Sequence, residues 1–259
     1  MLVGVLPVRF IVGLFVLVSA LSVSAHELKG SLPDHYPPYS IVGDTTKGII
    51  PDLLVALNSF SDHAYKAQPN TSRRSLKLLH EGQIHYRFDS QRWVANASHY
   101  YWSDAIVEVN DVLVYPASGP AINDIKQLQR LANDRQKPLR IGTRFDYHYP
   151  TLMPLLNNGN MVRDNFYSEI NMLKALADKE HGQLSAVVIA EHVYDYLLRS
   201  RPELVGELIK SSRPIDTALY QFQFPKTDNG RINMLYTNRL LDKLRRNGEL
   251  EKIVNNYTQ

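Results

Sequence analysis

The sequence predicts an α/β fold. Segments with strand character alternate with amphipathic helical segments, the order that places helices on both faces of parallel sheets. Apolar residues make up 44% of the 259 residues, and only one long apolar run occurs, so disorder and a polytopic membrane protein are excluded. The absence of cysteine excludes disulfides, cysteine-bound metals and thiol nucleophiles.

The first 25 residues predict an export signal rather than part of the fold. Arg9 is their only charge, an apolar run of 12 residues covers 10–21, and the small residues Val23 and Ala25 precede His26. This is the order of a secretory signal peptide. A 12-residue helix spans only about 18 Å, which is short of the ~30 Å membrane core. We therefore expect cleavage after Ala25 and a location in the periplasm.

In the first half of the mature chain, strands are expected at 28–32, 65–68 and 107–115, and helices at 51–60 and from a cap within 70–72 to Gly82. The strand at 107–115 is predicted from its alternating valines. Pro37 and Pro38 exclude a helix around them, whereas Pro51 is tolerated in a first helical turn. The segment 85–101 is polar and aromatic, without a clean period.

In the second half, helices are expected at 125–135, 151–158, 168–181, 191–199, 233–246 and 249–257, and strands at 139–142, 184–189 and 219–224. The apolar run 184–189 is typical of a strand buried on both faces. Residues 219–224 alternate strictly, as a strand with one buried face does. No repeat or Gly/Ser linker occurs, so two lobes, if present, must be joined by strands.

The sequence predicts no metal site, no cofactor and no nucleic-acid partner. His80 and His85 are five residues apart, which places them about 500° apart around a helix rather than on one face. The other seven histidines show no paired ligand spacing. Phosphate-loop, dinucleotide and nucleophile-elbow motifs are absent, and a net charge of +3 does not indicate a nucleic-acid binder.

Five segments, taken in order, resemble the extracellular solute-binding protein family 3, the periplasmic receptors of polar amino-acid ABC transporters. They are 36–41 with 48–54, 82–85, 101–104 with 112–114, 182–188, and 244–257. The resemblance implies a two-lobed periplasmic-binding-protein-like fold with a ligand cleft and a hinge of two crossover strands. It places lobe one at 26–115 plus 220–259 and lobe two at 116–219. It also implies a monomer that binds a small-molecule solute for an ABC permease or a membrane receptor.

The same resemblance identifies candidate ligand-binding residues. Tyr36 matches an aromatic residue that stacks on the ligand in relatives. The usual carboxylate-binding arginine is replaced by Asn96, the usual ammonium-binding aspartate by Ala190, and a glycine of the anion loop by Asp146. The standard clamp for a free amino acid is therefore missing, and other basic and aromatic residues are expected to bind the solute. The candidates are Tyr36, Tyr39, Arg74, Arg87, Arg92, Asn96, Trp102, Arg144 and Tyr147.

Two alternative functions stay open at this point. One is an exported enzyme of the prephenate or arogenate dehydratase type on the same scaffold, with Asp146, His148 and Glu191 as candidate acids or bases. The other is a regulatory protein without a ligand, which the loss of both clamp groups would explain. The preferred interpretation is a binding protein without catalytic residues.

Overall fold

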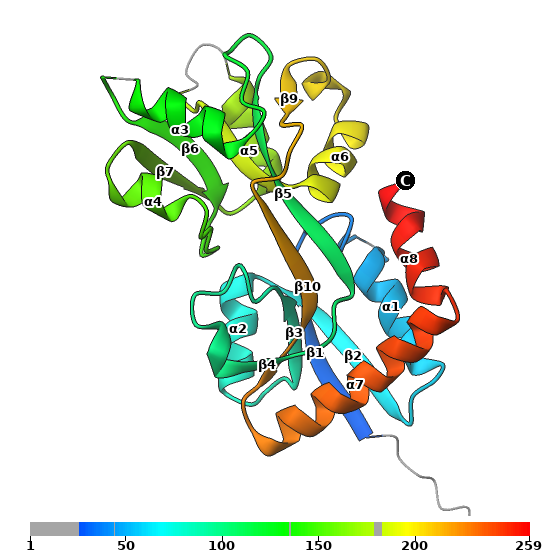
Figure 1. The fold of residues 1–259 in the computed structure, drawn as a ribbon. Coiled ribbons are helices and arrows are strands. Elements are labelled where there is room, and N and C mark those ends of the chain that lie inside the picture. Colours follow the sequence, from blue (N-terminus) through cyan, green and yellow to red (C-terminus); the bar gives the residue numbers. More distant parts are fainter. Residues whose placement is uncertain (1–25, 44, 135, 179–182) are drawn as a thin grey trace, which may run out of the picture.

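The computed structural model describes residues 26–259 except 44, 135 and 179–182, so the predicted export signal lies outside the described residues. Two α/β lobes are joined by two long strands, β5 (Val107–Pro116) and β10 (Asp216–Pro225) (Figure 1). These strands pair antiparallel with each other where they cross between the lobes. The strand order is β2-β1-β3-β10-β5-β8-β6-β7, with β4 beside β10 and β9 beside β5.

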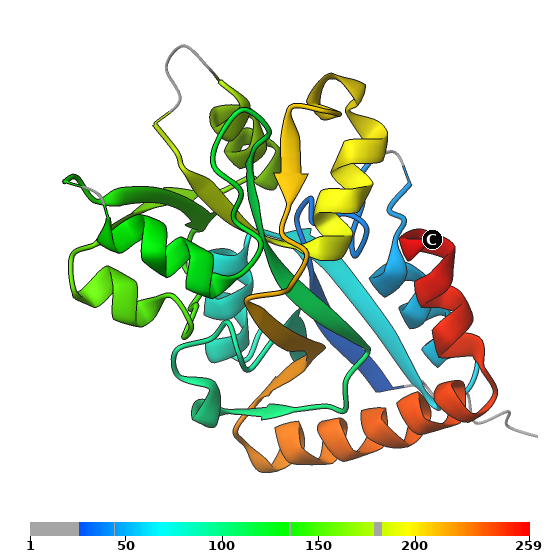
Figure 2. The same ribbon diagram turned by 45° about the horizontal axis from the view of Figure 1, so that its top comes forward.

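Lobe one contains the first four strands and the helices nearest both ends of the part of the chain that the structure describes. β1 pairs in parallel with β2 and β3, and β10 lies antiparallel to β3 and β4. The elements are β1 (His26–Pro33), α1 (Ile49–Asn58), β2 (His63–Asn70), α2 (Ser72–His80), β3 (Tyr86–Asp89), η1 (Ala97–His99), β4 (Tyr100–Trp102), α7 (Asp228–Arg246) and α8 (Glu249–Thr258). Figure 2 shows α7 running along the outer end of this lobe, with α8 folding back against α1.

Lobe two is built from the middle of the chain. β6 pairs in parallel with β7 and β8, and β5 lies antiparallel to β8 and β9. The elements are α3 (Ile125–Asn133), β6 (Leu139–Arg144), α4 (Met153–Asn157), β7 (Met161–Phe166), α5 (Glu169–Ala177), β8 (Ala186–Ala190), α6 (Glu191–Ser200), η2 (Pro202–Leu204) and β9 (Leu208–Lys210).

A tyrosine-rich loop of lobe one is held against the start of α1. The amides of Ile49 and Ile50 donate to the carbonyls of Pro38 and Tyr39, at 3.1 and 3.0 Å. Gly48 precedes them with φ of 125°, and a Cβ there would lie 2.7 Å from both carbonyl oxygens. A side chain at this position would push the loop away, so glycine is what allows the close approach.

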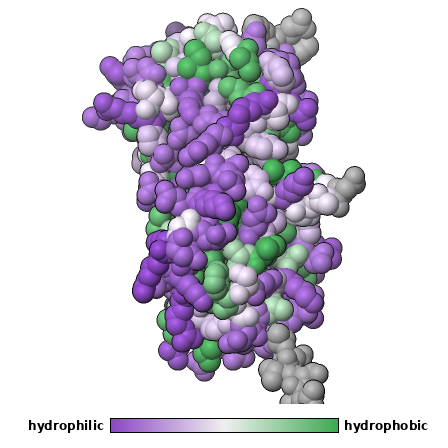
Figure 3. Space-filling model, turned by 90° about the vertical axis from the view of Figure 1, so that its right-hand side faces the viewer, coloured by the Kyte–Doolittle hydropathy of each residue, from purple (hydrophilic) through white to green (hydrophobic). Residues whose placement is uncertain are grey.

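The largest buried apolar cluster extends from lobe one across the crossover strands to α5 and α6, while a second cluster fills the other face of the lobe-two sheet. Figure 3 shows polar side chains over most of one side of the molecule, with apolar ones in separate patches. Among the helices of the described residues, none has both the length and the apolar character needed to cross a membrane.

The structure adds four strands that the sequence analysis did not predict: β3, β4, β7 and β9. β3 is entirely buried but contains Arg87 and Asp89, and β7 is a polar strand at the end of the sheet, so neither has the expected hydrophobic pattern. The sheet is also mixed rather than parallel, because both crossover strands run antiparallel to their neighbours. The α/β class itself is confirmed.

Candidate functional site

Three connected cavities follow the boundary between the lobes. The inner cavity has a volume of about 30 Å³, the outer cavity about 250 Å³ and the side cavity about 670 Å³. Asp34, directly after β1, lines all three, and Ser72 and Arg144 line both the inner and the outer cavity. Because they share wall residues from both lobes, the cavities are parts of one interlobe cleft.

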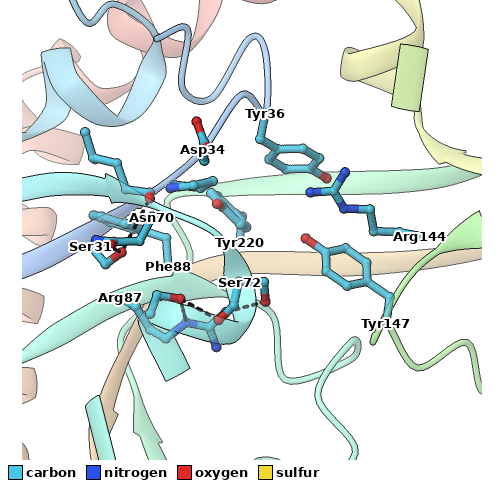
Figure 4. A pocket seen from close by; sticks show the side chains of 13 residues that line it. Ser31, Asp34, Tyr36, Asn70, Ser72, Arg87, Phe88, Arg144, Tyr147 and Tyr220 are labelled. Atoms are coloured by element: carbon cyan, nitrogen blue, oxygen red, sulfur yellow. Dashed lines mark hydrogen bonds between the residues drawn. The ribbon is translucent and has the colours of Figure 1, made fainter. Parts of the chain in front are cut away.

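Lobe one supplies the floor of the inner cavity. Figure 4 shows Ser31 of β1, Ser72 at the start of α2 and Tyr220 of β10 around this space. They meet here because the loop after β2 turns directly into α2, whose first turn faces β1 and β3. Thr71 caps this helix by accepting a hydrogen bond from the Arg74 amide. The cap fixes where Ser72 lies relative to the cavity.

Arg87 of β3, in the floor of the inner cavity, is held in place by several hydrogen bonds. Its guanidinium donates to an Asp89 carboxylate oxygen at 2.7 Å, to the side-chain amide oxygen Oε1 of Gln223 at 2.6 Å and to the hydroxyls of Ser75 and Ser72 at 2.9 and 3.1 Å. Its side chain is 5% exposed, and so is that of Asp89. The Arg87 charge is therefore neutralised inside the protein, and the residue's main effect on the cleft is to position Ser72.

Lobe two contributes Arg144, the last residue of β6. Its guanidinium donates to a Glu169 carboxylate oxygen at 2.9 Å and to the carbonyl of Tyr167. Burial raises the pKa of Glu169, and the Arg144 charge opposes that rise. Burial would lower the pKa of Arg144, but Glu169 and nearby tyrosines outweigh it and raise the pKa, so the guanidinium stays charged. In Figure 4 this group points between Tyr36 and Tyr147.

Two aromatic stacks flank the Arg144 guanidinium. In lobe one, Tyr36 stacks on Tyr39 with ring centroids 5.0 Å apart, and Tyr39 contacts Tyr220 at 4.8 Å. Tyr147 of lobe two stacks on Trp93 of lobe one at 5.1 Å. Within the described residues, the hydroxyls of Tyr36 and Tyr147 have no hydrogen-bonding partner, so both are available to a molecule in the cleft.

The outer cavity carries charges of both signs. Arg73, in the first turn of α2, and Arg144 supply positive charge, and Asp34 and Asp146 supply negative charge. Arg73, Asp34 and Asp146 are exposed. Asp146 has φ of 63°, a left-handed conformation that favours glycine and that aspartate tolerates. Asp146 thus has the backbone conformation expected of the glycine in the anion loop, but it also carries a carboxylate.

Direct contacts cross the cleft beside the tyrosines. The His148 amide of lobe two donates to the Trp93 carbonyl at 2.8 Å, and the Tyr39 hydroxyl pairs with Nδ1 of His192, on α6, at 3.0 Å. Burial lowers the pKa of His192, so this imidazole is neutral at neutral pH. Together with the Trp93–Tyr147 stack, these contacts hold the lobes together next to the inner cavity.

Two carboxylates face each other on the crossover strands. Asp111 of β5 and Asp216 of β10 are directly paired across the ladder. Trp93 donates its indole N–H to Asp111 at 2.8 Å, and Arg92 pairs with Asp216, to which the Thr151 hydroxyl also donates at 2.9 Å. Burial raises the pKa of Asp111 to about 7, Asp216 adds to the rise, and the Trp93 hydrogen bond and Arg92 oppose it.

Four of the nine predicted ligand-binding residues line the inner cavity: Tyr36, Arg87, Arg144 and Tyr147. The other five lie outside the three cavities. Tyr39 is buried behind Tyr36, Arg92 pairs with Asp216, Arg74 is exposed on α2, Asn96 is exposed and precedes η1, and Trp102 packs beside Tyr100 and donates to the Ala97 carbonyl.

The sequence analysis missed several residues of the cleft. Tyr220 was expected only as part of a strand, and Ser31, Asp34 and Ser72 carry no signal beyond strand-end and helix-cap chemistry. For Glu169, the partner of Arg144, the sequence predicts only a place in a helix. A polar residue at the end of a strand or the start of a helix was the available signal, but it occurs at many other positions.

No known protein-family model matches the chain, and no curated protein matches its sequence. Solved structures do match its shape. The GluR0 ligand-binding core in complex with L-glutamate has a TM-score of 0.72 at 15% identity, covering 91% of this chain and 100% of that one. A histidine kinase sensor domain similar to periplasmic binding proteins has a TM-score of 0.73 at 16% identity, covering 90% and 96%.

An amino-acid ABC transporter substrate-binding protein from Streptococcus pneumoniae, bound to L-arginine, has a TM-score of 0.68 at 15% identity and covers 90% of this chain and 94% of that one. The chain has the two-lobed periplasmic-binding-protein fold. Identities this low establish the fold and leave the solute undetermined.

The residues considered for catalysis do not converge. Asp146 is exposed in the outer cavity, His148 contacts Trp93 through its backbone, and Glu191 forms an ion pair with Lys210 at 2.7 Å.

Proposed function

We propose that this protein binds one small polar solute, about the size of an amino acid, between its two lobes and closes on it about β5 and β10. The observation that carries the proposal is the convergence of Tyr36 from lobe one with Arg144 and Tyr147 from lobe two on the inner cavity beside the crossover strands. That cavity alone holds about one water, so the solute would extend into the outer cavity of about 250 Å³, which Arg144 and Ser72 also line. A group that contacts both lobes favours the closed form and so shifts the population toward it.

The cleft suggests how this solute would be held. The free hydroxyls of Tyr36 and Tyr147 would hydrogen-bond its polar groups, and their rings would cover its faces. Arg73 and the amino end of α2 would attract an anionic group, and Asp34 a cationic one. This arrangement differs from the usual amino-acid clamp, whose positions carry Asn96 and Ala190. The neighbours' ligands, L-glutamate and L-arginine, indicate the size of solute to test first.

The proposal includes the protein's location and partners. Export with cleavage after Ala25 would deliver a monomer to the periplasm, where the closed form would contact an ABC permease or a membrane receptor. Lobe one would comprise 26–115 plus 220–259 and lobe two 116–219, with the boundaries inside or next to the two crossover strands. The protein would act by binding alone, without a catalytic residue.

A thermal-shift screen of the mature chain tests this function. The panel contains amino acids, polyamines, organic acids and aromatic metabolites. A ligand present at 100 times its Kd stabilises the folded state by about 2.7 kcal/mol, which raises the Tm of a domain this size by roughly 5–10 °C. Hits are confirmed by titration calorimetry with Tyr36→Ala and Tyr147→Ala, which we expect to weaken binding, and with the exposed Asn96→Ala as the matched control.

Each other outcome contradicts the proposal. Equal affinity of Tyr36→Ala, Tyr147→Ala and the control would place the solute outside the described cleft. Conversion of a prephenate-like compound would support the enzyme instead. If no compound on the panel stabilises the protein, the regulatory alternative without a ligand is favoured.

A further inference from the structure

The side cavity of the interlobe cleft has no role in the proposed function as stated so far. Its volume of about 670 Å³ exceeds that of the inner and outer cavities together and falls within the roughly 300–1,000 Å³ of typical ligand pockets. Lobe one supplies the loop after β1, and lobe two supplies the start of α5 and the end of α6. Because both lobes line this cavity, a group bound in it would also favour the closed form.

Apolar side chains form much of the wall of the side cavity. Lobe one contributes Pro37, Ile41 and Val42, and lobe two contributes Ile170, Tyr196 and Leu197. All of these except Leu197 are only half-buried, so apolar surface is left in contact with water. An apolar group placed in the cavity would remove this surface from water, which is favourable.

The charged residues around the side cavity are either paired or exposed. Glu169 is buried, and its carboxylate accepts a hydrogen bond from Arg144 at 2.9 Å. Since Arg144 lines the inner and outer cavities and Glu169 the side cavity, this ion pair stands between them. Asp34, His35 and Arg201 are exposed. Among the described residues that line the side cavity, no buried charge is left unpaired, so the cavity favours an uncharged group.

The side cavity and the outer cavity share part of their walls. Asp34 of lobe one and Tyr167 of lobe two line both of them. Both residues are exposed, and Tyr167 retains 73% of its accessible surface. Exposed side chains can move aside at little cost, so one molecule can occupy both cavities.

We propose that the solute has two parts: a polar head in the outer cavity and an uncharged apolar arm, aliphatic or aromatic, in the side cavity. This inference rests on the proposed function and names the class of solute that the cleft would select. The arm would distinguish this solute from a purely polar one, because each methylene buried against an apolar wall raises affinity about fourfold. The sequence gave no indication of the cavity, because its walls come from three segments that only the fold brings together.

The test is titration calorimetry of the chain of residues 26–259 with three pairs of compounds. The two members of a pair share a head and differ by three methylenes: alanine and norleucine, propionate and hexanoate, propylamine and hexylamine. In the pair whose head the cleft accepts, we expect the longer compound to bind at least about tenfold more tightly, since full burial of the added methylenes would give roughly sixtyfold.

Two variants locate the arm. Val42→Asp places a charge in the wall, and Ser200→Trp fills space at the end of α6, where the residue is exposed. Both should remove most of the difference between the two members of a pair. Val205→Asp, at a valine that is 60% exposed outside the three cavities, is the matched control and should preserve the difference. Urea unfolding without ligand checks that each variant is folded.

The apolar arm is overturned if both members of every pair that binds have equal affinity, or if Val42→Asp and Ser200→Trp leave the difference intact. The proposed function stands after either result if Tyr36→Ala and Tyr147→Ala still weaken binding, so the two proposals fail separately. Binding of none of the six compounds also overturns the inference, whereas another compound of the thermal-shift panel could still support the proposed function.

Discussion

Asp111 should make the protein less stable as the pH rises from acid toward neutrality. Its pKa is about 7 in the folded protein against an ordinary value of 3.8. Between these values the folded state holds the proton more strongly than the unfolded chain, so stability falls as the pH rises from 3.8 to 7. About three pKa units at 1.36 kcal/mol each set an upper limit of about 4 kcal/mol for the loss.

Asp111→Asn removes the titrating group and keeps a carbonyl oxygen that can accept the Trp93 hydrogen bond. We expect the variant to match the wild type near pH 4 and to exceed its free energy of unfolding at pH 8, by up to about 4 kcal/mol. Urea unfolding followed by tryptophan fluorescence at pH 4.5, 6 and 8 measures the difference, with the exposed Asp104→Asn as control. A difference that stays constant with pH, or a less stable variant at pH 8, would refute the reasoning.

Three further predictions are measured by urea unfolding at pH 7. Arg144→Gln leaves the buried Glu169 without its charge partner and should cost about 3–5 kcal/mol, most of which Arg144→Gln/Glu169→Gln should recover. Gly30→Ala places a Cβ 2.2 Å from the ring of Tyr86 and should cost about 1–3 kcal/mol. Tyr39→Phe removes the hydrogen bond to His192 across the cleft and should cost about 1 kcal/mol.

Each of these has an outcome that contradicts it. For Arg144, a double variant no more stable than the single one would mean that the lost charge pair is not the cause. For Gly30, an unchanged midpoint would mean that the ring moves aside at no cost. For Tyr39, equal losses from Tyr39→Phe and Tyr101→Phe, a half-buried tyrosine of β4, would assign the effect to general packing.

The elements with a clear hydrophobic period could be predicted from the sequence. The alternating residues 107–115 and 219–224 are strands, and the apolar run 184–189 covers most of β8, which is buried throughout. α7 begins at Asp228, five residues before the expected start, because Thr227 caps it by accepting from the Gly230 amide. Strands that bury charges could not be found this way. Arg87 is stabilised inside β3 by an ion pair with Asp89 and by a hydrogen bond to the side-chain amide oxygen of Gln223, and Gln223 is distant in sequence.

The site was predictable only where a residue type and its local motif agree. Tyr36 stands beside prolines that fix its loop, Arg144 ends β6 and Tyr147 lies in the loop that follows, so these three could be predicted from the sequence. Arg92 was expected near the ligand, but its charge is paired with Asp216 on the crossover strand. Such pairing depends on how the segment after β3 lies against β10 in space, which no local pattern contains.

The order of the strands also constrains how the protein is made. β10 lies in the sheet of lobe one between β3 and β5, yet it is synthesised after the whole of lobe two. Lobe two can therefore fold while the part of lobe one that has already been synthesised still has an open sheet edge on β3. Until the last forty or so residues have been synthesised, that edge is exposed to other unfinished chains, and protection of the nascent polypeptide matters most during this interval.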